Sequence, residues 1–191
     1  MNKGELHLDL KWSKRIQKTA GSEELGTYVF TQLVLTEKEY IESNDNDVDW
    51  ELVASNIGVD FISIQRNGSI EFQHVTDPEM IEVIKEQGLI YDRSFVHDLG
   101  CGVYGYLFNG DAGDIAMDNI KTYLENNETE DLAILTIDYD GEYLECIYGE
   151  GHEGYIVIPN DLSPTNIRDI EEINILDFIN YRFSEYNFSE L

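Results

Sequence analysis

Short stretches of alternating apolar and polar residues, separated by clusters of Gly, Asn and Asp, run through most of the chain. Period-two alternation and β-branched or aromatic runs predict strands. The predicted strands cover 27–35, 60–65, 69–75, 103–108, 132–139, 143–148 and 155–158. Two turn signals join neighbouring strands in this interpretation: Arg66-Asn67-Gly68 and Asp140-Gly141 are each typical of a β-hairpin turn. The acidic stretch 39–51 is expected to be a loop.

Helical spacing of apolar residues indicates a helix that begins after residue 76. Thr76 or Asp77 can cap its first turn, which contains Pro78, and Gly88 is expected to end it. Its predicted inward stripe consists of Met80, Ile81, Ile84 and Leu89.

Two further helices are predicted nearer the C-terminus. One covers about 114–125, and the tail, 166–183, is expected to form a short strand followed by a C-terminal helix. Because strands and helices do not alternate strictly, the pattern favours an α+β fold over a doubly wound sheet.

Charge is the strongest feature of the composition. The 191 residues contain 39 Asp and Glu but 12 Lys and Arg, a net charge of −27. The first 34 residues are nearly neutral, whereas 101–160 contain thirteen acids and one base, Lys121. Such a chain repels nucleic acid and anionic lipid and favours a basic partner protein. Spread evenly over a folded surface of about 9,300 Å², the charge would be about threefold thinner than that of duplex DNA. A DNA mimic would therefore need it gathered on one face.

Several classes of protein are disfavoured by the sequence. No apolar run approaches the length of a membrane span, and no secretory signal pattern opens the chain. Cys101 and Cys146 form no disulfide framework, so a reducing, cytoplasmic setting is expected. The four histidines lack the spacing of a zinc site, and no metal is expected. Phosphate-binding loops, a dinucleotide fingerprint and a serine nucleophile elbow are missing from the sequence.

One ordered series of short segments carries a family resemblance. The segments are Phe72-Gln73-His74-Val75-Thr76, Lys85-Glu86-Gln87-Gly88-Leu89-Ile90, Asp98-Leu99-Gly100-Cys101-Gly102-Val103-Tyr104, Ile115-Ala116-Met117 and Glu153-Gly154-Tyr155-Ile156-Val157-Ile158-Pro159. Over roughly residues 69–170 this order resembles the ADP-ribosyltransferase superfamily, in particular its His-Tyr-Glu, PARP-like branch. The resemblance implies a core of two small packed antiparallel sheets with flanking helices. It divides the chain into an N-terminal β-rich extension, 1–66, and a transferase-like domain with a C-terminal helix, 67–191.

The resemblance also implies a cleft that binds NAD as a substrate. In that cleft His74 would hydrogen-bond a ribose, Thr76 would support the same edge, and Tyr104 would stack on the nicotinamide. Gly102 would let the backbone approach the ligand. Glu153 matches the catalytic carboxylate, which would stabilise the oxocarbenium-like ribose.

Two assignments within this cleft leave alternatives open. Glu150 lies three residues before Glu153 in a Gly-rich segment, so it could be the catalytic carboxylate instead. Arg93 is the best candidate for holding the NAD pyrophosphate, and Arg66 is the second.

Two functions follow as expectations. The first is an NAD-dependent ADP-ribosyltransferase that modifies a protein acceptor. The alternative is an acidic inhibitor, in part a mimic of DNA, that occupies a basic nucleic-acid-binding surface of a partner and leaves the NAD cleft degenerate or unused. Neither function involves direct contact with nucleic acid or a membrane.

Overall fold

The computed structural model describes 15–18, 29–44, 48–90, 102–107, 131–149 and 152–174 of the chain. The strands are β1 (Arg15–Lys18), β2 (Val29–Thr36), β3 (Phe61–Thr76), β4 (Val103–Tyr106), β5 (Asp131–Tyr148), β6 (Tyr155–Ile158) and β7 (Ile167–Asn174). The helices are α1 (Glu37–Asn44), α2 (Trp50–Ile57) and α3 (Ile81–Gln87), with 3₁₀ turns η1 (Pro78–Met80) and η2 (Pro164–Asn166). No helix within these ranges is both long and apolar enough to cross a membrane.

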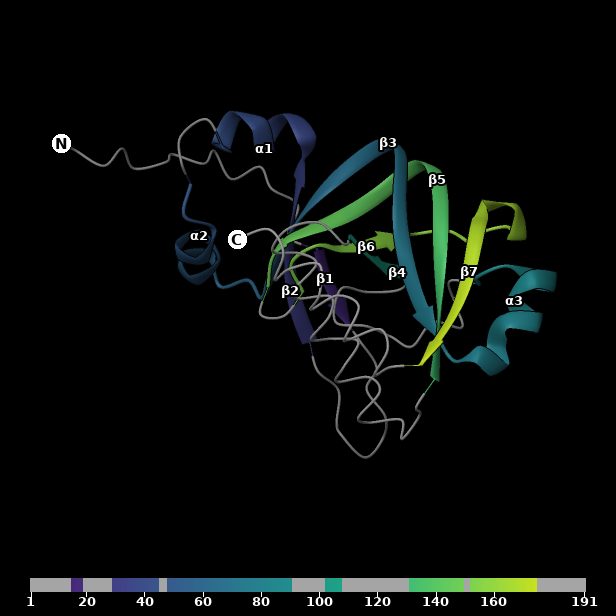
Figure 1. Ribbon diagram of the computed structural model, residues 1–191. Helices are drawn as coiled ribbons and strands as arrows, with labels where there is room; N and C mark the ends of the chain where they lie inside the picture. Colours follow the sequence, from purple (N-terminus) through teal and green to yellow (C-terminus); the bar gives the residue numbers. More distant parts are fainter. Residues whose placement is uncertain are drawn as a thin grey trace, which may run out of the picture.

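The described strands form one sheet in the order β1-β2-β3-β4-β6-β5-β7, and β3 also pairs with β5. Of these pairings, β2 with β3 is parallel and the others are antiparallel. Since β3 pairs with both β4 and β5, and β6 joins β4 to β5, these four strands close a ring. Figure 1 shows β3 and β5 arching together, with β4 and β6 crossing below the arch. The mixed α+β class is thus confirmed, but the expected two separate sheets are replaced by one sheet that folds back on itself.

The folding back depends on a bend shared by β3 and β5. Gly68 and Gly141 face each other in the register of this pair, and both have positive φ angles, 153° and 158°. Glycine tolerates such angles because it has no Cβ. The two hairpins predicted at Asn67-Gly68 and at Asp140-Gly141 are therefore wrong: each strand continues through its glycine. The true partner of each half is a segment about 70 residues away, a pairing that no local turn signal encodes.

Helix α1 covers the first part of the stretch 39–51 that was predicted to be a loop, and α2 begins at its end. A capping box begins α1: the Thr36 hydroxyl accepts from the Glu39 amide at 3.3 Å, and the Glu39 carboxylate accepts from the Thr36 amide at 2.8 Å. The side chain of Asp49 caps α2 by accepting from the amide of Leu52, and Gly58 ends it in a left-handed conformation. These capping residues were not recognised in the sequence because the acidic composition of 39–51 is typical of a loop.

The predicted helix after residue 76 is confirmed as η1 followed by α3. Asp77 caps its start, Pro78 lies in the first turn, and Gly88 ends it. Ile81, Ile84 and Leu89 are buried as expected, but Met80 is 43% exposed, so its assignment to the inward stripe is wrong. Met80 lies where the 3₁₀ turn passes into the α-helix, and the change of pitch there shifts it away from the predicted stripe.

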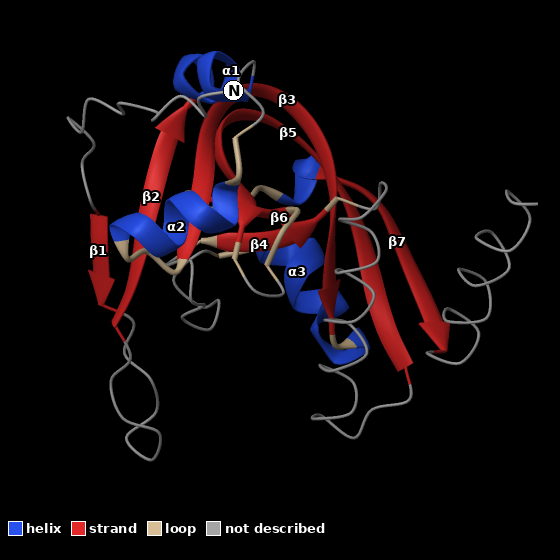
Figure 2. Ribbon diagram, turned by 90° about the vertical axis from the view of Figure 1, so that its left-hand side faces the viewer, coloured by secondary structure: helices blue, strands red, loops and turns tan. Residues whose placement is uncertain are grey.

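Three apolar clusters hold the described elements together. The first packs α3 and Leu162 against inward residues of β3, β4, β5 and β6, among them Phe72 and Leu135. The second lies on the opposite face of β4 and β6, and a third packs α1 and α2 against β2 and β3. Figures 1 and 2 place α1 and α2 with β1 and β2 at one end of the arch, and α3 with β7 at the other.

Strands are confirmed at 29–35, 61–65, 69–75, 103–106, 132–139, 143–148 and 155–158, and the strand at the start of the tail is β7. The helices expected at 114–125 and at the C-terminus lie outside the described residues. The division into 1–66 and 67–191 stays a prediction, although β3 crosses that boundary without interruption.

Candidate functional site

His74 and Tyr104, the two best-matched residues of the predicted cleft, lie on neighbouring strands. Nδ1 of His74 in β3 is 2.6 Å from the backbone oxygen of Tyr104 in β4. Because a carbonyl oxygen only accepts, Nδ1 donates in this bond. Burial lowers the pKa of the His74 imidazole, while the hydrogen bond to Tyr104 acts in the opposite direction. The histidine is thus held against the β4 backbone in its neutral form at pH 7.

The ring of Tyr104 points into the apolar cluster on the far face of β4. Tyr104 is 6% exposed and packs with Phe61, Cys146, Tyr155 and Val157. Its ring meets the Tyr155 ring nearly edge-on, with centroids 6.4 Å apart. A ring that stacks on nicotinamide needs a free face, so Tyr104 would have to leave this cluster to do so.

Thr76 is the last residue of β3 and Gly102 immediately precedes β4, and no open cleft lies beside Gly102. A Cβ at Gly102 would come within 2.5 Å of Val157 Cγ1 and 2.9 Å of the Ile158 backbone oxygen. The space beside Gly102 is therefore filled by β6, the strand that pairs with β4. Thr76 ends β3 opposite Ala133 and is half-buried.

Glu153 lies in the turn between β5 and β6. It is half-buried, and its Oε1 accepts from the Gly149 amide at 3.3 Å. Its charge acts on Cys146, where burial first and the Glu153 carboxylate to a lesser degree raise the thiol pKa to about 12. Cys146 is consequently a protonated core residue. Glu150 and Arg93, the other two candidates, lie outside the described residues.

Arg66, the second candidate for the NAD pyrophosphate, is already bound within the chain. Its Nε donates to the Glu145 carboxylate, and its Nη1 lies 2.9 Å from Glu37 Oε1. The guanidinium also lies over the ring of Tyr40, 5.8 Å from the centroid. This arrangement raises the pKa of Arg66, chiefly through Glu145 and against the effect of burial. With Tyr104 in the core and the space at Gly102 filled, NAD binding would require these residues to rearrange, and the NAD site stays a prediction.

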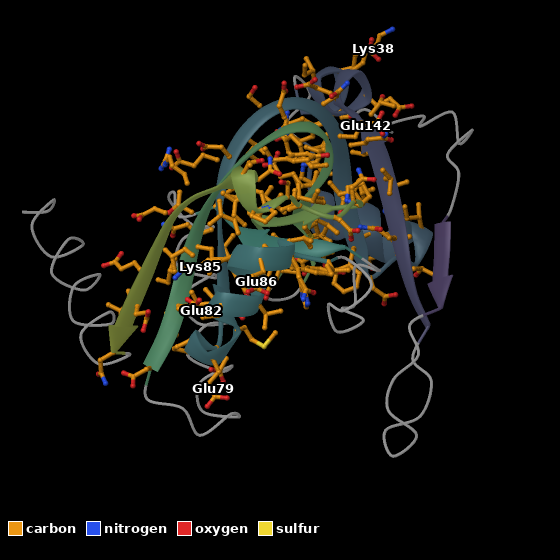
Figure 3. All side chains as sticks on the ribbon, turned by 90° about the vertical axis from the view of Figure 1, so that its right-hand side faces the viewer. Lys38, Glu79, Glu82, Lys85, Glu86 and Glu142 are labelled. Atoms are coloured by element: carbon orange, nitrogen blue, oxygen red, sulfur yellow. The ribbon has the colours of Figure 1, made fainter. Side chains whose placement is uncertain are left out.

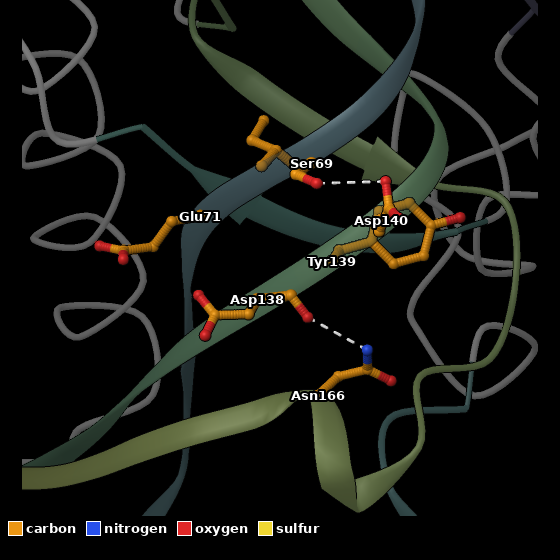
Figure 4. Close-up of a pocket in the computed structure, with 7 residues that line it drawn as sticks. Ser69, Glu71, Asp138, Tyr139, Asp140 and Asn166 are labelled. Atoms are coloured by element: carbon orange, nitrogen blue, oxygen red, sulfur yellow. Dashed lines mark hydrogen bonds between the residues drawn. The ribbon is translucent and has the colours of Figure 1, made fainter.

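A pocket that was not expected from the sequence lies beside the bend of β3 and β5. It has a volume of about 390 Å³ and is lined by Ser69, Ile70, Glu71, Asp138, Tyr139, Asp140 and Asn166. Figure 4 shows the Ser69 hydroxyl donating to Asp140 Oδ1, at 3.2 Å, and the Asn166 amide donating to the Asp138 backbone oxygen, at 3.1 Å. Three carboxylates, those of Glu71, Asp138 and Asp140, give the pocket a negative potential.

A guanidinium from the chain itself already meets two of these carboxylates. Arg168 of β7 donates to Glu71, and its Nη1 is 3.5 Å from Asp138 Oδ1. Glu71 and Asp138 face each other across β3 and β5, so their proximity follows from the strand pairing. The sequence did not indicate that Glu71 and Asp138 lie close together, because the pairing of these two strands was predicted wrongly.

The four basic side chains that the structure describes are all engaged in ion pairs. Lys38 pairs with Glu42, Lys85 with Glu82, and the two arginines pair as above. The structure also describes 21 Asp and Glu side chains. The described part of the molecule therefore presents a surplus of negative charge and no basic group uncommitted to an acid.

Metal ligands do not gather in the described part of the chain: it contains no group of three or more His, Cys, Asp or Glu residues placed to hold an ion. Comparison with known proteins yields no match: neither a family model, nor a curated protein, nor a solved structure resembles this chain detectably.

Proposed function

We propose that the protein is an acidic binding protein that occupies the basic, nucleic-acid-binding surface of a partner protein and inhibits it by occupancy. The observation that carries this proposal is the charge balance of the described surface. Its 21 carboxylates face four bases, each of which already pairs with an acid of the same chain. A basic partner protein would complement this surplus of negative charge.

Physical chemistry supports a basic protein as that molecule. A surface of one sign steers an oppositely charged partner and speeds association, and it disfavours partners of like charge such as nucleic acids. The pocket at the bend adds a feature that fits a basic side chain. Arg168 demonstrates that a guanidinium can meet Glu71 and Asp138 together, and Asp140 adds a third carboxylate to the pocket.

A displacement experiment tests the proposal. An arginine-rich peptide is bound to fluorescent duplex DNA, and the protein is titrated into the complex without NAD. We expect release of the DNA at near-stoichiometric amounts of protein. A matched variant, Glu71→Gln with Asp138→Gln and Asp140→Gln, should release less. Failure of the wild-type protein to release DNA at any ratio would contradict the proposal.

The second candidate is the NAD-dependent ADP-ribosyltransferase. One observation favours it: the His74–Tyr104 hydrogen bond brings the first and third matched segments onto neighbouring strands. If NAD binds there, NAD should raise the melting temperature by mass action. Glu153→Gln should then lower transfer of label from NAD to protein by about 10²–10³ with binding nearly kept. No thermal shift at millimolar NAD and no transferred label would remove this candidate.

A further inference from the structure

The outer face of η1 and α3 combines exposed apolar side chains with a row of acids. Met80 is 43% exposed and Val83 is 36% exposed, whereas Ile81 and Ile84 of the same segment are buried in the core. Met80 and Val83 are three residues apart, so they lie side by side on the helix surface. Large apolar residues exposed together are typical of interaction sites.

Acidic residues flank this apolar pair. Glu79, Glu82 and Glu86 follow one another at spacings of three and four residues, which places them along one side of the helix. Figure 3 shows all three at the end of the molecule formed by α3, with Lys85 among them. Lys85 is bound to Glu82 at 2.9 Å, so the row retains a net negative charge.

We infer that this face, the α3 face, docks an apolar patch ringed by lysine or arginine on the partner protein. The inference rests on the proposed function and names the part of the surface that makes the contact. Apolar contacts at the centre of an interface supply affinity, and charges at its rim supply orientation and association rate. Methionine suits such a centre because its flexible thioether adapts to the shape of the partner.

A second copy of this chain is a poorer occupant than a basic protein. Two α3 faces related by a two-fold axis would bring their Glu79, Glu82 and Glu86 rows together. Opposed carboxylates repel one another, and Lys85 is already bound to Glu82. Charge complementarity therefore selects a partner of opposite sign.

Two synthetic peptides test the α3 face. The first is an amphipathic helix with a leucine stripe flanked by arginines, and the second has the same arginines with serines in place of the leucines. Fluorescence anisotropy measures the binding of each to the full-length chain. We expect the leucine peptide to bind roughly tenfold more tightly than the serine peptide, since only the former covers Met80 and Val83.

Two double variants locate the effect. Met80→Ser with Val83→Ser should abolish the preference for leucine. The matched control is Ile41→Ser with Leu52→Ser, which removes apolar side chains of 55% and 56% exposure on α1 and α2 and should leave the preference intact. Urea unfolding of each variant verifies that it folds.

The outcomes separate the two proposals. If both peptides bind the wild-type chain equally, or if the preference survives Met80→Ser with Val83→Ser, the α3 face is not the docking site and the acidic binding function stands. If neither peptide binds, the proposed function fails together with the docking site.

Discussion

Gly68 and Gly141 lie directly opposite each other across β3 and β5, and both have positive φ angles. On one side of this pair, β3 and β5 carry residues that pack with α1 and α2. On the other side the same two strands pack against α3, and Ser69 and Asp140, the neighbours of the two glycines, enter the acidic pocket. One pair of long strands thus joins both ends of the molecule and positions the pocket between them.

Two glycines at helix ends provide a matched test of the packing. Gly58 and Gly88 end α2 and α3, with φ angles of 66° and 77°. A Cβ at Gly58 meets nothing within 4 Å, whereas a Cβ at Gly88 would lie 1.9 Å from the Leu162 backbone oxygen. We expect Gly58→Ala to lower the free energy of unfolding by about 1 kcal/mol, the cost of backbone strain alone.

Gly88→Ala should cost more, about 3 kcal/mol or above. The Gly88 backbone (φ 77°, ψ −165°) has a conformation essentially confined to glycine, and Leu162 must also move, which disturbs its two backbone hydrogen bonds with Leu89. Urea denaturation followed by tryptophan fluorescence measures both variants. Equal losses in the two would show that Leu162 does not pack on Gly88 as described.

Arg66 and Arg168 provide a second matched pair. Each arginine meets two carboxylates, but the Arg66 side chain is 24% exposed and that of Arg168 is 52% exposed. Arg66→Met leaves the half-buried Glu145 without its partner and should lower the free energy of unfolding by about 1–3 kcal/mol, between the limits for exposed and buried pairs.

Arg168→Met should be nearly neutral for stability, since water screens that pair. It also frees Glu71 and Asp138, so the arginine-rich peptide should bind this variant more tightly than it binds the wild type. Weaker binding of the peptide to Arg168→Met would argue against the pocket as a site for a basic side chain.

The Asn-Gly and Asp-Gly dipeptides show what the sequence could and could not predict. Local patterns located the strand residues on both sides of Gly68 and Gly141. They also narrowed the cap of the helix to Thr76 or Asp77, and the structure shows that it is Asp77. A two-residue turn and a bend in a continuous strand, however, use the same residues. Only the pairing of β3 with β5, whose partner residues are 57 to 86 positions apart in the sequence, decides between them. The acidic pocket depends on that pairing, so it could not be found before the fold.

At the candidate site, the sequence likewise could not predict the direction in which the Tyr104 side chain points. The sequence placed His74 and Tyr104 in matching segments, and the structure brings those segments together. It did not predict that β4 and β6 are covered on both faces, which buries the Tyr104 ring among Phe61, Cys146 and Tyr155. A four-residue strand gives no alternating pattern long enough to distinguish one covered face from two.

The half-buried imidazole of His74 predicts a pH dependence of stability. Unfolded His74 binds a proton near pH 6.5, and the folded state binds it only at lower pH because burial lowers the pKa. Between these two values the unfolded state holds more protons, so the free energy of unfolding falls as the pH falls below about 6.5.

Comparison with His74→Gln isolates this effect, since the surface carboxylates are common to both proteins and glutamine can still donate to Tyr104. Unfolding in urea at pH 7 and at pH 5 should show that the wild type loses stability relative to His74→Gln. An unchanged difference would mean that His74 is not buried in its neutral form.

If opposite charge drives recognition, the association rate constant must depend strongly on salt. Stopped-flow mixing with the arginine-rich peptide should be carried out from about 0.01 M to about 1 M salt, where the Debye length falls from ~30 Å to ~3 Å. We expect the association rate constant to fall by roughly tenfold or more over this range, with no requirement for NAD. A rate constant that is independent of salt, or binding that occurs only with NAD, would contradict it.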